Sequence, residues 1–135
     1  MCSKQEHLQL RPPMNCAEFR DRFDGFDTGR TLTSFSDPNY SAWCEHFHDC
    51  QACGDWGLAA RVRRWGHAPE AFPCIHMAYR ALETCDQHED RAECHDLFIE
   101  HAATSDAYYL IKGQVRLRID FCPWCGVKLP EPRRE

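Results

Sequence analysis

The first third of the chain carries aromatic residues at helical spacing. Asn15 can cap a short helix over residues 16–23. Phe19 and Phe23 are four positions apart, so they would share one face of this helix. Residues 24–36 are rich in Gly, Thr, Ser and Asp, and this composition predicts a loop.

Two further helices are predicted before residue 66. Asp37 offers an acceptor side chain and Pro38 suits a first helical turn, which together predict a helix over residues 38–49. Residues 50–54 interrupt the pattern, and a second helix is predicted over residues 55–65. The evidence for this helix is the helical spacing of Leu58, Val62 and Trp65, and Gly66 is expected to end it.

The hydrophobic period changes in the second half of the chain. Helices are predicted over residues 74–84 and 91–101, with a polar turn at residues 86–90 between them. Apolar and polar residues then alternate, which is typical of a half-buried β-hairpin, here with Lys112 and Gly113 at its turn. The apolar positions of this alternation are Tyr108, Leu110, Val115, Leu117, Ile119 and Phe121.

These elements predict an α+β fold. Residues 1–14 are polar and read as a tail, and residues 15–135 are expected to form a single zinc-stabilised domain. Its sub-parts would be a small helical part at residues 15–66 and a part at residues 72–130. The second part would combine the β-hairpin with a zinc-ribbon-like knuckle.

Composition disfavours some functions and favours metal binding. Apolar residues make up 43% of the 135 residues, and the formal charge is −5, which disfavours nucleic-acid binding through bulk charge. No apolar run approaches the roughly 20 residues that span a bilayer, and no secretory signal is recognisable, so we expect a cytoplasmic protein without a membrane partner. In a reducing compartment, ten cysteines and eight histidines favour metal ligation over disulfides.

The most informative motif is Cys122-Pro-Trp-Cys125-Gly126, called the knuckle below. Two thiolates separated by two residues can face one zinc ion, and the glycine allows the tight turn that this requires. The rival interpretation is a glutaredoxin-type redox site, in which a helix activates the first thiol. The residues after Gly126 include two prolines and cannot form that helix, so the metal interpretation is preferred.

A structural zinc site needs two donors besides the knuckle. Cys85 and His88 lie where a helix ends in a polar turn, and we expect this pair to complete the site. Two other segments compete for the same role, and they carry Cys74 with His76 and Cys94 with His95.

A second candidate site lies between the first two long helices. The spacing His46-x3-Cys50-x2-Cys53 resembles the zinc-binding motif of anti-sigma factors, over about 25 residues. This resemblance implies that the three residues are ligands and that the fourth comes from elsewhere. The candidates for the fourth position are Cys16, Cys74 and His76, and His48 is an alternative to His46.

Residues 72–130 resemble a group of uncharacterised bacterial and phage proteins with a zinc-ribbon-like end. The matching pieces are Pro73 to Tyr79, Cys85-x2-His88, Glu93 to Asp96, and Ile119 to Pro130, which contains the knuckle and the following Val-Lys-Leu-Pro. His95 departs from that group, where proline often occupies this position. The resemblance implies a metal-bound fold and no particular activity.

The function expected from these features is a non-enzymatic, zinc-stabilised module that binds a protein partner. A regulator, an inhibitor or an immunity-type protein of bacterial or phage origin would fit. One zinc ion is expected if only the knuckle is loaded, and two if both clusters are. The alternatives are a metal-dependent enzyme with an open zinc position and a nucleic-acid-associated zinc protein.

Overall fold

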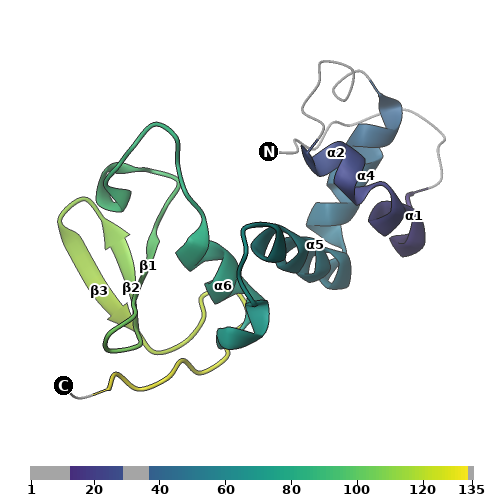
Figure 1. Ribbon diagram of the computed structural model, residues 1–135. Coiled ribbons are helices and arrows are strands. Elements are labelled where there is room, and N and C mark those ends of the chain that lie inside the picture. The colour runs from purple at the N-terminus through teal and green to yellow at the C-terminus, as the bar shows by residue number, and fades with distance from the viewer. Residues whose placement is uncertain (1–12, 29–36, 134–135) are drawn as a thin grey trace. The chain divides into compact units, whose positions relative to one another are not determined.

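A computed structural model describes residues 13–28 and 37–133 (Figure 1). The helices are α1 (Cys16–Asp21), α2 (Phe23–Thr28), α4 (Pro38–Asp49), α5 (Gln51–Arg64) and α6 (Ile75–Leu82), with two 3-10 turns, η1 (Pro69–Ala71) and η2 (Arg91–Glu93). The strands are β1 (Ile99–Ala102), β2 (Ala107–Lys112) and β3 (Val115–Ile119). The predicted α+β class is therefore confirmed. None of the helices in the described part is long and apolar enough to cross a membrane.

The chain divides into two compact units, residues 1–57 and residues 58–135. The first is helical and the second holds α6 and the sheet (Figure 1). The core of the first unit is a cluster of aromatic rings. Phe19 and Phe23 are completely or almost completely buried, and Trp43 stacks on Phe19 at a centroid distance of 5.2 Å. The indole Nε1 of Trp43 also donates a hydrogen bond to the Phe19 carbonyl oxygen. The rings of Phe47 and Trp56 also belong to this cluster.

Gly57 lets the backbone of α5 lie close to this cluster. A Cβ atom there would lie 2.8 Å from Cζ of Phe47 and 2.9 Å from Cε2 of Phe23. We expect Gly57→Ala to destabilise the first unit by about 1–3 kcal/mol, because overpacking outweighs the roughly 1 kcal/mol that alanine gains in helix propensity. Urea unfolding followed by tryptophan fluorescence measures this difference.

The matched control is Gly25→Ala in α2, where a Cβ would meet no atom within 4 Å. This variant should be as stable as the wild type or slightly more stable. Equal stability of the two alanine variants would show that the aromatic cluster adjusts freely around residue 57.

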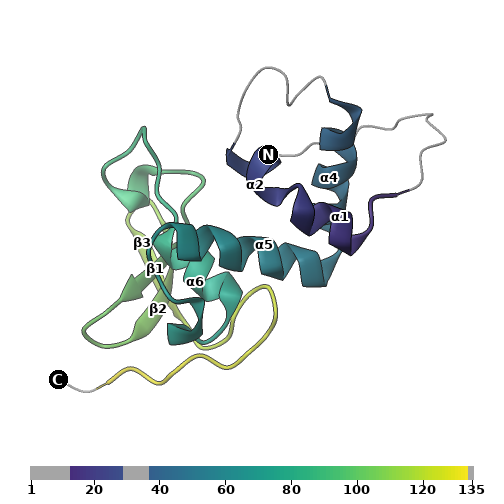
Figure 2. The same ribbon diagram turned by 45° about the vertical axis from the view of Figure 1, so that its right-hand side comes forward.

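The second unit is a three-stranded antiparallel sheet with α6 packed beside it. The strand order is β1-β2-β3, and the register pairs Ile99 with Leu110 and Tyr108 with Ile119. Figures 1 and 2 show α6 next to the strands, with part of the C-terminal segment passing close to α6. The core residues of this unit are Met77, Ile99, Tyr108, Cys122 and Leu129, so the first knuckle cysteine is part of the hydrophobic core.

Several predicted elements are confirmed. The helix over residues 38–49 is α4, with the Asp37 side chain accepting a hydrogen bond from the amide of Asn39. The helix at residues 74–84 is α6, and the hairpin turns at residues 113–114, where Gly113 has a positive φ of 59°.

The predicted helix over residues 91–101 is wrong. The chain forms η2, an extended stretch and then β1, which pairs with β2. Residues 97–99 are a short apolar run, and the period of such a run does not separate helix from strand. Pairing with β2 makes residues 99–102 a strand.

Three smaller differences concern element boundaries and burial. Helix α5 begins at Gln51, so the interruption after α4 is the single residue Cys50. Helix α2 begins at Phe23 and occupies residues 24–28 of the predicted loop. The remaining residues of that loop lie outside the described part, as do residues 1–12 of the predicted tail. Val115 and Leu117 are 68% and 60% exposed, so these apolar side chains of the predicted half-buried hairpin remain uncovered.

Candidate metal centres

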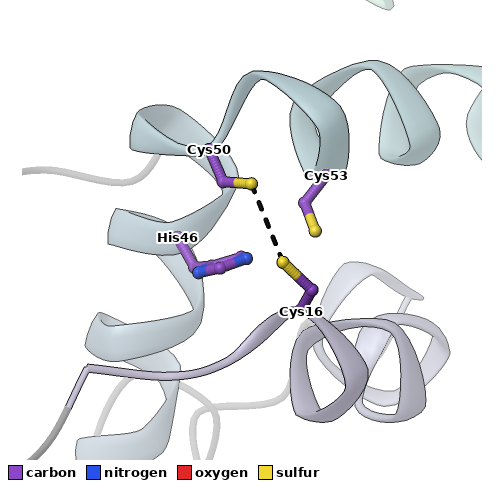
Figure 3. Close-up of side chains that lie close together, drawn as sticks. All are labelled: Cys16, His46, Cys50 and Cys53. Carbon is purple, nitrogen blue, oxygen red and sulfur yellow. Dashed lines mark hydrogen bonds between the residues drawn. The ribbon is translucent and has the colours of Figure 1, made fainter.

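The first candidate centre gathers four donors from three helical segments of the first unit. Cys16 begins α1, His46 lies in the last turn of α4, Cys50 caps α4, and Cys53 lies in the first turn of α5. Their donor atoms all lie within 4.8 Å of one another. Figure 3 shows the imidazole ring and the three sulfur atoms pointing toward one common point.

The spacing of these atoms fits a tetrahedral zinc ion. The sulfur atoms of Cys16 and Cys50 are 3.9 Å apart (Figure 3). Two sulfurs bound to one zinc at 2.3 Å in a tetrahedron would be about 3.8 Å apart, whereas a disulfide needs about 2.05 Å. In addition, the buried Nε2 atom of His46 has no hydrogen-bond partner among the described residues. A metal ion would satisfy this nitrogen, which is otherwise costly to bury.

The pKa values of two cysteines at this centre are shifted in opposite directions. Burial raises the pKa of Cys53 to about 11, because the charged thiolate loses its hydration. The backbone amide of Cys53 in turn lowers the pKa of Cys50 by hydrogen bonding to its sulfur. A divalent cation at the common point would compensate the buried charge that the thiolates otherwise create.

The second candidate centre is built on the knuckle. The Cys122 amide donates to the Val127 carbonyl at 2.9 Å, and the Gly126 amide donates to the Cys122 carbonyl at 2.9 Å, which closes the turn. Gly126 has a positive φ of 74°, so this glycine allows the tight turn that the sequence predicts here. The Trp124 amide also points at the Cys122 sulfur, at 3.4 Å.

Two residues at the start of α6 complete this centre. Cys74 is the N-cap of the helix, and His76 lies in its first turn. Their donor atoms and those of Cys122 and Cys125 lie within 4.8 Å of one another. Burial raises the pKa of Cys74 to about 12. Burial also opposes the thiolate form of Cys125, but hydrogen bonds from the Val127 amide and the His76 and Cys122 side chains outweigh it and lower its pKa to about 7.

The expected pairing of the knuckle is therefore corrected. Cys74 and His76 lie beside Cys122 and Cys125, and Cys85 and His88 do not. Helix α6 packs against β1, and Met77 shares one hydrophobic core with Cys122, so the start of α6 is brought to the knuckle.

A third group consists of Cys85, His88 and Cys94. These residues lie in the connection between α6 and β1, and their donor atoms are also within 4.8 Å of one another. The Cys85 sulfur lies 3.4 Å from Nδ1 of His88, and this hydrogen bond lowers the pKa of Cys85.

The structure brings the predicted residues of the first centre together, except for one alternative. The three residues His46, Cys50 and Cys53 lie together as predicted, and Cys16 supplies the fourth donor. His48 is exposed and pairs with Asp49 instead. His95 is exposed and belongs to none of the three groups. Eight cysteines of the described part carry free thiols, and they are the eight that form these groups.

Metal binding at the first two centres should depend steeply on pH. Each centre must lose three thiol protons to bind zinc, so the metal-free state binds more protons, and metal affinity rises with pH. Below pH 8 the logarithm of the zinc association constant of the first centre should fall by up to about 3 per pH unit, because burial keeps Cys53 protonated there with a pKa of about 11. At the second centre the fall should be about 2 per pH unit above pH 7 and about 3 below it, because Cys125 has a pKa of about 7. Competition with a chromogenic chelator across a pH series measures this slope. An affinity that stays constant between pH 8 and pH 6 would contradict thiolate ligation.

Comparison with known proteins gives one match. Residues 71–135 match a domain of unknown function, DUF6980, which covers just under half of the chain. The matched segment contains the second centre and the third group and leaves out the first centre. No curated protein matches the chain, and neither does any solved structure.

Proposed function

We propose that this chain is a zinc protein in which two Cys3His centres each hold one unit together, and that the second unit binds a protein partner. The observation that carries this proposal is that three cysteines and one histidine converge twice, each time within 4.8 Å. Sulfur and nitrogen donors in fours suit tetrahedral zinc. Four protein ligands leave no position for water, so both centres are suited to stabilising a fold rather than to catalysis.

The role in partner binding is supported by a surface of the second unit. Five side chains form it, called the aromatic–arginine surface below: Trp65, Tyr79, Arg80, Phe98 and Trp124. Trp65 stacks on Tyr79, and Trp124 stacks on Phe98, with centroid distances of 5.4 and 5.8 Å. The Arg80 guanidinium lies over the Trp124 ring at 4.9 Å and also over the rings of Tyr79 and Phe98.

The composition of this surface is that of an interface centre. Trp65 and Trp124 are each 41% exposed, although large aromatic rings are usually covered. Tryptophan, tyrosine and arginine are enriched among residues that dominate binding energies, and stacked rings lose little freedom on binding. The partner that suits this surface presents an apolar side chain that covers the rings and a carboxylate that pairs with Arg80 beside Glu83, whose Oε2 lies 3.5 Å from the Arg80 guanidinium.

A photo-crosslinking experiment tests this role. A photoreactive amino acid in place of Trp65 should trap the partner in the native host, and the purified partner can then be titrated against variants. Trp65→Ala and Arg80→Ala should each weaken its binding by about tenfold or more, as expected for residues at the centre of an interface. Trp124 is left unchanged because it lies between two proposed ligands.

The control is Arg63→Ala, an exposed residue paired with Glu70 outside this surface, which should bind as the wild type does. All variants should retain their zinc. Equal affinity of all variants would contradict the proposed surface. Salt-sensitive binding of a single-stranded oligonucleotide, with no protein trapped, would favour a nucleic-acid function instead.

A further inference from the structure

The group formed by Cys85, His88 and Cys94 differs from the two centres described above. It contains three donors, and no other Cys, His, Asp or Glu side chain of residues 13–28 and 37–133 joins it. Its spacing is nevertheless that of a metal site. The Cys85 sulfur and His88 Nδ1 are 3.4 Å apart, and two such donors on a tetrahedral zinc ion would be about 3.5 Å apart.

Hydrogen bonds within the chain hold the segment that carries these donors. Arg91 lies between them in sequence, and its guanidinium donates to the carbonyl oxygens of Glu83, Arg80 and Ile99 at 2.6, 2.9 and 2.9 Å. The Asp90 side chain also accepts a hydrogen bond from the Ala92 amide and starts η2. These bonds tie the connection to α6 on one side and to β1 on the other.

The group is also poorly placed to stabilise the fold. Its outermost donors are nine positions apart, whereas His76 and Cys122 of the second centre are 46 positions apart. Closing a short loop removes less chain entropy than closing a long one, so a metal here adds little constraint to the unfolded chain. A site with three donors and little role in stability resembles the zinc sites that keep one position open for chemistry or for ligands.

We propose that Cys85, His88 and Cys94 form a third zinc site whose fourth position is open to an exchangeable nitrogen donor. Two thiolates balance the charge of Zn²⁺, so the bound ion is neutral overall and remains able to accept a donor. The surrounding segment, residues 85–96, contains a single arginine and five acidic residues: Asp86, Glu89, Asp90, Glu93 and Asp96. Their field repels anions, so a neutral donor such as an imidazole is preferred over a small anion, with water as the resident ligand in its absence.

Cobalt substitution of the full-length protein tests this proposal, with imidazole as the probe. Co²⁺ has visible absorption bands that report coordination, and it takes the same ligands as zinc. We expect three equivalents to bind, and imidazole to shift the bands of the weakest equivalent alone. Azide at the same concentration should shift them less. Cys85→Ser/Cys94→Ser should bind two equivalents and show no imidazole response.

His95→Ala is the matched control, because His95 is adjacent to Cys94 but outside the group. This variant should bind three equivalents and respond to imidazole as the wild type does. A wild type that binds two equivalents, or a third equivalent that ignores imidazole, would overturn the open site. Loss of the imidazole response on mutating His95 would also overturn it.

These outcomes are separate from the fate of the two Cys3His centres. If the double variant still binds two equivalents, the proposed stabilising role stands whatever happens at the third site. If the double variant binds none, the proposed function itself fails.

Discussion

Removing zinc from the purified protein with excess chelator, under reducing conditions, is expected to abolish its cooperative unfolding transition. Structural zinc contributes about 10–16 kcal/mol to folding in small zinc domains at neutral pH, and a typical domain is stable by only about 5–15 kcal/mol. Losing either ion would therefore consume most or all of the stability of the unit that holds it. Near-ultraviolet circular dichroism should lose the signals of the packed tryptophans, including buried Trp43.

Adding back one equivalent of zinc per centre should restore the spectrum and the transition. This reversal separates metal loss from damage by the chelator. A metal-free protein that retains its near-ultraviolet spectrum and melts at the same temperature would show that the aromatic and hydrophobic cores suffice without metal.

The second large effect is expected from single ligand substitutions, because each Cys3His centre lies within one unit. Cys53→Ser should lose one zinc ion and unfold the first unit, since Cys53 is completely buried there. Cys122→Ser should lose a different ion and unfold the second unit, whose core contains Cys122. Breaking one centre should cost several kcal/mol, up to the whole contribution of its ion.

Amide spectra recorded by nuclear magnetic resonance give the readout for each unit, and the two variants serve as controls for each other. In Cys53→Ser the dispersed signals of residues 58–135 should persist, and in Cys122→Ser those of the described residues before 58 should persist. Collapse of the entire spectrum in both variants would mean that the units fold only together. Retention of both ions in either variant would contradict the assigned ligands.

Local sequence signals were sufficient for the elements that carry their own start and turn residues. Helix α4 was predicted from Asp37 and Pro38, and the β2–β3 hairpin from the alternation around Gly113. The helix predicted over residues 91–101 is wrong, because the end of this segment forms β1 and pairs with β2. Such pairing joins residues that are distant in sequence, and local periodicity does not report it.

Local signals also predict donors that are close in sequence, and they do not predict donors that packing brings together from distant segments. His46, Cys50 and Cys53 were recognised together because all three lie within eight positions at one helix junction. The sequence favours Cys85 and His88 as donors for the knuckle because they lie where a predicted helix ends in a polar turn. The packing of α6 against β1 decides in favour of the start of α6, and this packing cannot be read from spacing alone. One sequence signal does point to these donors. Cys74 lies at the N-cap of α6 and His76 follows two positions later, so both side chains lie at the start of one helix.

X-ray absorption at the zinc edge measures the ligands of the two Cys3His centres when it is recorded on the Cys85→Ser/Cys94→Ser variant, in which only these centres contribute. We expect two zinc ions per chain, with a mean shell of three sulfurs at about 2.3 Å and one nitrogen at about 2.0–2.1 Å. A shell made of light atoms alone, or a folded chain without zinc, would contradict the proposed centres.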